Sequence, residues 1–135
     1  MRYLVKAKVL QSQEQRLLRA ICGGDLGAGS VAGDEYLYDM EHARRLEDGT
    51  ICWIETCFCP VPLQEELPYW EEYFDILGIK NAHDPRRCRD RNGTEPWACC
   101  SCDCTLALER RLSHRGTGFL NSLTTTAEEH LAGAG

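Results

Sequence analysis

The sequence has no long hydrophobic run and no excess of positive charge. No uninterrupted apolar stretch is longer than that from Ile51 to Ile54, whereas a membrane-spanning helix needs about 20 apolar residues. Lys and Arg number 15 against 21 Asp and Glu, which gives a formal net charge of −6 at pH 7. A chain with this charge repels polyanions on average. We therefore expect neither a membrane nor a nucleic acid as a partner.

The first residues also lack the apolar core of a secretion signal, because charges at Arg2, Lys6 and Lys8 interrupt it. We therefore expect a cytoplasmic protein. The length of 135 residues, with 43% hydrophobic and 27% charged residues, is typical of one globular domain. We expect residues 1–135 to form this domain, with a core at 1–85 and a cysteine-rich module with a helical tail at 86–135.

Familiar catalytic motifs are absent as well. The glycine-rich stretch from Gly23 to Gly33 has neither a P-loop lysine nor the spacing of a dinucleotide-binding fingerprint. The glutamates, including Glu55 and Glu66, and the four histidines form no zinc-protease helix and no nucleophile triad. We expect His42 at the surface or in packing contacts. The sequence thus assigns no catalytic residue and no small-molecule substrate, and it leaves open whether the protein is an enzyme.

Cysteine, in contrast, is abundant. The chain has nine cysteines, eight of them between positions 52 and 104. In a reducing compartment, clustered thiols are more often metal ligands or redox groups than structural disulfides. The densest groups are Cys57-Phe58-Cys59 and the stretch from Cys99 to Cys104, and a further cysteine, Cys88, lies among four arginines.

These groups can form a zinc site. Zinc favours four tetrahedral ligands, and thiolate sulfur is among the best of them. Two Cys-x-Cys pairs that approach from a strand end and from a later loop supply four thiolates, so we predict zinc bound by Cys57, Cys59, Cys102 and Cys104. Alternative ligands are Cys88, Cys99, Cys100 and His83. We expect a mainly structural role, because the free energy of ligation becomes folding free energy when the unfolded chain lacks the site.

Two other chemistries fit the same thiols. A thiol redox or sensor protein would use Cys88, whose arginine neighbours favour the reactive thiolate, with a resolving thiol from the stretch Cys99 to Cys104. An iron–sulfur cluster would use the same soft ligands, although the familiar ferredoxin spacings are missing. Cys22 and Cys52 are expected to pack as small hydrophobic side chains.

Hydrophobic periodicity predicts the N-terminal elements. Alternation over residues 2–10 predicts a strand, and apolar residues at helical spacing predict a helix over about 12–22. Residues 35–46 and 51–59 are expected to form two strands joined around Asp48-Gly49, a dipeptide suited to a tight hairpin turn. Both sides of the second strand are largely apolar, which indicates an inner strand.

The following segment has an apolar stripe at helical spacing. Five large side chains predict a helix whose stripe is a packing surface, namely Leu63, Leu67, Trp70, Phe74 and Leu77. We expect this helix to end at Gly78 and a short strand to follow at 79–82. The pattern then predicts a helix from Thr105 and another from Phe119.

This order of elements resembles the split βαβ arrangement of ferredoxin-like α+β proteins. The resemblance implies an antiparallel sheet with two helices on one face, to which this chain adds a cysteine-rich C-terminal segment with a helix. The order is also similar to that of the dimeric α/β-barrel domains, whose sheets pair between subunits. The resemblance spans about residues 1–85 and implies a homodimer that forms through the sheet face opposite the helices. It carries no catalytic motif.

Overall fold

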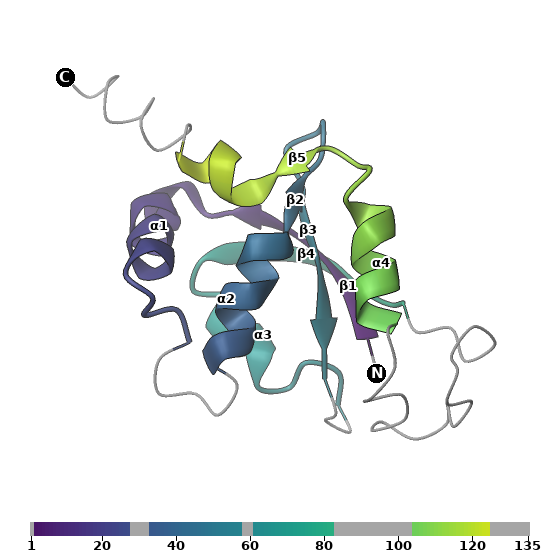
Figure 1. Cartoon of the computed structure of the whole chain (residues 1–135). Coiled ribbons are helices and arrows are strands. Elements are labelled where there is room, and N and C mark those ends of the chain that lie inside the picture. The colour runs from purple at the N-terminus through teal and green to yellow at the C-terminus, as the bar shows by residue number, and fades with distance from the viewer. Residues whose placement is uncertain (1, 28–32, 58–60, 83–103, 125–135) are drawn as a thin grey trace.

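The structure is a computed structural model that describes residues 2–27, 33–57, 61–82 and 104–124. These residues form an α+β structure around a five-stranded antiparallel sheet (Figure 1). The strands lie in the order β4-β1-β3-β2-β5. Their bounds are β1 Arg2–Val9, β2 Arg44–Arg45, β3 Ile51–Thr56, β4 Phe74–Asn81 and β5 Thr117–Gly118.

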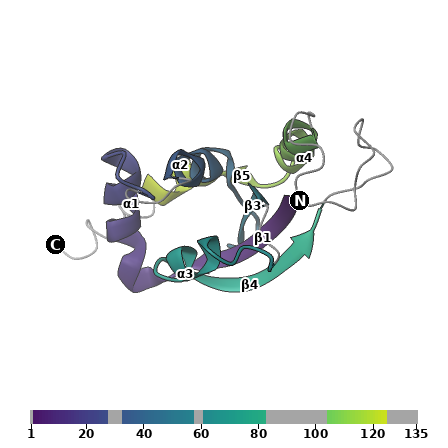
Figure 2. The same ribbon diagram turned by 90° about the horizontal axis from the view of Figure 1, so that it is seen from below.

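Helices cover both faces of this sheet. Their bounds are α1 Glu14–Cys22, preceded by a 3-10 turn at Gln11–Gln13, α2 Gly33–His42, α3 Glu66–Trp70 and α4 Cys104–Leu112. A last helix is described over residues 119–124. Figure 2 shows α2 and α4 on opposite sides of β3. None of the helices in the described ranges has both the length and the apolar character needed to cross a bilayer.

The predicted first strand and first helix are confirmed. In β1, Tyr3, Val5 and Ala7 are buried while Lys6 and Lys8 are exposed, which is the alternation of a strand with one face on the core. This strand lies at the centre of the sheet, because it pairs with β3 on one side and with β4 on the other.

The predicted turn at Asp48-Gly49 is also confirmed. Gly49 has a φ of 86°, a backbone conformation that favours glycine. The backbone N–H of Thr50 donates to Asp48 Oδ1 over 2.9 Å, and this contact lowers the pKa of Asp48 below its ordinary value. The strands on either side pair antiparallel, with Arg44 opposite Cys52. As predicted, β3 is an inner strand, and residues 51–55 are all buried.

The prediction of a strand over 35–46 is wrong, because residues 33–42 form α2 and only Arg44–Arg45 remain in a strand. The buried apolar residues of this segment are Tyr36, Met40 and Ala43, and their spacing of four and three is helical. Acidic residues in the first turn, Asp34 and Glu35, also favour a helix because they face its positive dipole end.

The prediction of a long helix after Leu63 is wrong as well. The helix α3 ends at Trp70, and Phe74–Asn81 form β4 instead of the expected short strand at 79–82. This segment pairs along the whole free edge of β1, so strand pairing overrides the local helical spacing. The prediction that the stripe is a packing surface is confirmed for Leu63, Trp70 and Phe74, which are fully buried, but it is wrong for Leu77, which is 50% exposed.

The core has two parts, one on each face of the sheet. The larger part joins β1 and β3 to α1, α2, α3 and the helix at 119–124, with Trp53, Trp70, Phe74 and Phe119 as its largest fully buried side chains. The smaller part consists of Cys52, Ile54 and Leu112, with Leu4, Leu46 and Leu108 packed against it. The sequence predicted two helices on one face and did not place the C-terminal one. The structure puts α4 over the second face, which is the face predicted to pair in a homodimer.

Candidate functional site

Three buried carboxyl groups gather on the larger core side of the sheet, and we call them the carboxyl cluster: Asp39 on α2, Glu55 on β3 and Glu66 on α3. They are 5%, 3% and 9% exposed. Glu55 points into the core because the strand alternates, so that it lies on the same side as Ile51 and Trp53. Asp39 lies on the buried side of α2, next to Met40.

Glu55 accepts hydrogen bonds from two tryptophans. The indole Nε1 of Trp53 donates to Oε2 over 2.9 Å, and Nε1 of Trp70 lies 3.0 Å from both Oε1 and Oε2. The two ring centroids are 5.1 Å apart. An indole N–H only donates and needs a partner when it is buried. The carboxyl group of Glu55 is the acceptor for both rings.

Asp39 is the second carboxyl group of the carboxyl cluster. Asp39 and Glu55 influence each other's pKa, while the Oδ2 atom of Asp39 has no hydrogen-bond partner within the described part of the chain. Burial raises the pKa of Asp39 well above its ordinary value, and the charge of Glu55 raises it further. Burial also raises the pKa of Glu55, to about 7, although the two indole hydrogen bonds act in the opposite direction.

The surroundings of this pair are acidic. Glu66 raises the pKa of Glu55, and it also raises that of Glu35, on which burial has the larger effect. The ion pairs seen among the described residues, Arg16–Glu72 and His42–Glu109, do not include the carboxyl cluster. Within the same residues, no group of His, Cys, Asp and Glu has the arrangement to hold a metal ion.

A second polar contact joins α2 to α4. Tyr38 Oη donates to Glu109 Oε1 over 2.6 Å, and burial raises the pKa of Tyr38 above its ordinary value. The exposed ring of His42 stacks on Tyr38 with centroids 4.0 Å apart, so the prediction of a surface position is confirmed. Its Nδ1 lies 3.9 Å from Glu109 Oε2, which is beyond hydrogen-bond distance.

Four cysteines lie in the described residues, namely Cys22, Cys52, Cys57 and Cys104. Cys52 is buried as predicted, whereas the prediction that Cys22 packs is wrong because this side chain is exposed. Cys57 is 2% exposed, and its Sγ is 3.8 Å from Glu66 Oε2. Cys104 is the first residue of α4 and is partly exposed. The remaining predicted ligands lie outside the described residues: Cys59, Cys88, Cys99, Cys100, Cys102 and His83.

The structure brings together two residues that each lie next to a predicted zinc ligand. Thr56, next to Cys57, has its Oγ1 atom 3.5 Å from Oγ1 of Thr105, next to Cys104. Arg2 Nε also donates to Thr105 Oγ1, over 2.5 Å. The end of β3 and the start of α4 are therefore adjacent, although they are far apart in the sequence.

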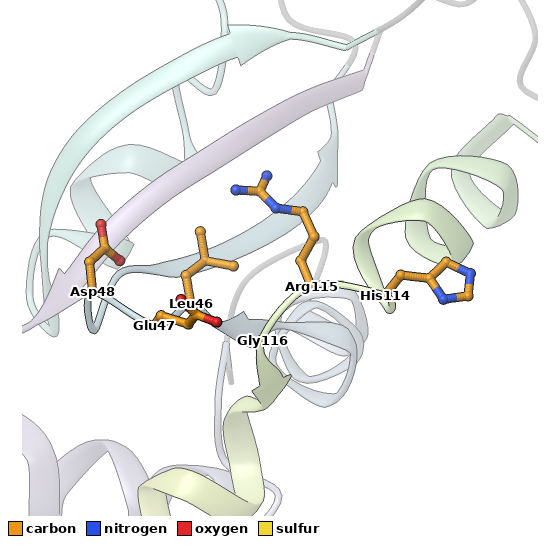
Figure 3. A pocket seen from close by; sticks show the side chains of 6 residues that line it. All are labelled: Leu46, Glu47, Asp48, His114, Arg115 and Gly116. Carbon is orange, nitrogen blue, oxygen red and sulfur yellow. The ribbon is translucent and has the colours of Figure 1, made fainter.

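An open depression of about 440 Å³ lies beside the β2–β3 turn and is lined by Leu46, Glu47, Asp48, His114, Arg115 and Gly116. In Figure 3, Arg115 extends toward the sheet, whereas His114 points away from the other lining residues. A second depression, of about 240 Å³, shares Asp48 and includes Lys8 and Arg45. Both mix acidic and basic side chains, and the described residues that line them include neither the carboxyl cluster nor a cysteine.

Comparison of the chain with protein-family models, curated proteins and solved structures finds no match. The functional assignment therefore depends on the residues themselves. Sequence reasoning missed the carboxyl cluster, although one signal for part of it was present. Glu55 lies on the inward side of a strand whose neighbours are apolar, and a buried acid in that position requires a partner.

Proposed function

We propose that the protein is a cysteine-rich metal-binding protein, with a zinc-thiolate site of mainly structural role where β3 ends and α4 begins. The observation that supports this proposal is the contact between Thr56 and Thr105. It shows that the two segments leading to the predicted ligand pairs start from the same place in the fold.

The distances along the chain fit such a site. Cys59 follows Thr56 by three residues, and Cys102 precedes Thr105 by three. Three residues span at most about 11 Å, and a thiolate binds zinc at about 2.3 Å. Both thiols are therefore within reach of one metal ion near Cys104.

The proposed ligand set leaves Cys57 out. Its thiol packs in the larger core part against Glu66, whereas Thr56, the preceding residue, faces Thr105 of α4. We therefore propose Cys59, Cys102 and Cys104 as ligands, and a fourth ligand from Cys88, Cys99, Cys100 or His83. Such a site would hold residues 86–103 against the sheet and contribute to folding free energy.

We also propose that the fold is ferredoxin-like. The order β4-β1-β3-β2 with all neighbours antiparallel supports this, as do the helices between β1 and β2 and between β3 and β4. In this view β5 and α4 are additions to the shared core. The zinc site would then lie where the added helix joins the sheet.

Replacement of one proposed ligand tests the function. We expect the full chain, purified without added metal, to carry about one zinc ion with reduced thiols. Cys102→Ser should lose most of this zinc and lower the unfolding midpoint at the same time. Elemental analysis, thiol titration and thermal unfolding measure these quantities.

Cys22→Ser is the matched control, because this exposed thiol on α1 lies outside the proposed site, and it should keep both zinc and stability. Thiols that become titratable only after reduction, in a zinc-free chain, would favour the redox alternative. Iron with inorganic sulfide would favour an iron–sulfur cluster. A zinc-free chain with all thiols reduced would contradict every form of the proposal.

A further inference from the structure

The strand β4 lies at one end of the sheet order, and β1 is its only neighbouring strand in the described part of the chain. Figure 2 shows β4 along the margin of the sheet. Its other edge therefore presents backbone N–H and C=O groups that no described strand pairs. The strand has eight residues, whereas many proteins protect such an edge by keeping it very short. An edge of this kind can accept a strand from another chain.

Apolar surface is exposed along the same strand. The side chain of Leu77 is exposed, and a Cβ atom added at the adjacent Gly78 would meet nothing within 4 Å. Ile76 and Ile79 pack against the larger core part but are only partly buried. A partner that pairs with this edge would cover these side chains, and the removal of their apolar surface from water favours association.

An extra residue in β4 determines which of its side chains share a face. In the register with β1, Ala7 pairs with Ile76 and Lys6 pairs with Gly78. Leu77 between them has no partner position, which is the pattern of a β-bulge. Side chains alternate between faces in a regular strand. Across the bulge this alternation shifts by one, so residues an odd number of positions apart lie on the same face.

The charged residues of β4 lie on either side of this bulge and share the face of the smaller core part. Lys80 pairs with Leu4 of β1, which packs in that core part, and Asp75 pairs with Lys8, which lies on the same side of β1 as Leu4. Asp75 and Lys80 are both exposed. No ion pair within the described residues includes either of them.

The sequence DILGIK at residues 75–80 is complementary to itself in antiparallel pairing. When two copies of β4 pair about a two-fold axis between the central residues, Asp75 of each copy lies opposite Lys80 of the other, on the same face. Ile76 then lies opposite Ile79, and both of these side chains are on the face of the larger core part. Opposite charges and β-branched residues placed opposite each other stabilise a strand pair.

We propose that β4 pairs in this register with β4 of a second copy of the chain, so that the two sheets join into one. The charges make the pairing selective, because an unrelated strand leaves Asp75 or Lys80 without an opposite charge. The interface is the free edge of the sheet and not the sheet face from which the sequence predicts a homodimer. This inference does not depend on the proposed zinc site.

Charge reversal tests the register, with sedimentation velocity of the full chain in reducing buffer as the measurement. We expect the wild-type chain to form a dimer that dissociates on dilution. Asp75→Lys places lysine opposite lysine at both ends of the pair, and Lys80→Asp places aspartate opposite aspartate. Each variant should weaken the dimer by about tenfold or more. An equimolar mixture of the two variants should restore it, because every lysine then faces an aspartate.

Glu41→Lys makes the same change of charge as Asp75→Lys at an exposed position of α2, so it is the matched control and should dimerise like the wild type. A wild-type chain that stays monomeric up to about 100 µM would overturn the proposal. A dimer that both β4 variants leave unchanged would overturn it as well, as would a mixture that associates no more tightly than each variant alone. If circular dichroism shows that one variant does not fold, the wild-type mass and the other variant decide the matter.

Discussion

At the scale of single residues, the unusual feature is Glu55, a buried acid at a core position where apolar side chains are usual. Glu55 follows the alternation of β3 into the interior and there meets two indole N–H groups. Had the residue been apolar, both indoles would have been left without an acceptor, at a cost of about 1–3 kcal/mol for each unsatisfied group. The acid is therefore part of the packing of Trp53 and Trp70.

The pH dependence of stability tests this residue. Because the pKa of Glu55 is raised from 4.5 to about 7, the folded chain binds more protons than the unfolded chain between these values. The stability from this group is fully present below about 4.5 and is lost as the pH rises through about 7. Glu55→Gln should therefore reduce the fall in unfolding free energy between about pH 5 and pH 8 by roughly 1–3 kcal/mol.

Urea unfolding at a series of pH values measures this fall. Glu65→Gln, an exposed site beside α3, is the control and should keep the wild-type slope. A Glu55→Gln variant whose unfolding free energy depends on pH as strongly as that of the wild type would contradict the assignment.

At the scale of elements, local signals predicted some structures and long-range pairing decided the others. The alternation in β1 and the turn at Asp48-Gly49 are local, and both were predicted correctly. The spacing of the apolar residues predicts that the segment from Phe74 onward is helical. It forms β4 instead, because β1 has a free edge with which it pairs. No sequence pattern within one segment contains that information.

The same limit applies to the candidate sites. The cysteine groups are visible in the sequence because they are close together along the chain. The carboxyl cluster is not, because Asp39, Glu55 and Glu66 come from three elements and the prediction had made the first of these a strand. Only the packing of α2 and α3 against β3 brings the three side chains together.

The pairing of β2 with β5 gives a prediction at this scale. Gly116 has a φ of 59°, and a Cβ atom there would overlap the backbone carbonyl oxygen of Arg45. Gly24 has a similar φ of 71°, but a Cβ atom would meet nothing within 4 Å. Gly24→Ala should thus cost only the left-handed strain, about 1–2 kcal/mol, and Gly116→Ala should cost clearly more because the backbone must also move.

Chemical unfolding of the two alanine variants measures the difference directly, since the backbone strain is common to both. Equal losses of unfolding free energy in the two variants would show that Gly116 lies farther from the Arg45 backbone than in the structure.

At the scale of the whole molecule, the two faces of the sheet are covered unequally by helices. Most of the described helices pack on the side of Trp53, whereas α4 is the only one of them on the other side, where it makes a small apolar contact around Cys52, Ile54 and Leu112. A helix held by so few apolar contacts gains from a further link to the sheet. A zinc-thiolate site at its first residue would provide this link.

The proposed zinc site requires zinc to be held by sulfur at the junction of β3 and α4, and zinc-edge X-ray absorption of the purified full chain tests this most directly. The predicted result is a first shell composed mainly of sulfur, at about 2.3 Å from the metal. The Cys102→Ser chain should lose this shell, while the Cys22→Ser chain should keep it. A first shell of nitrogen and oxygen alone, at about 2.0–2.2 Å, would contradict the account, as would a chain that carries no zinc.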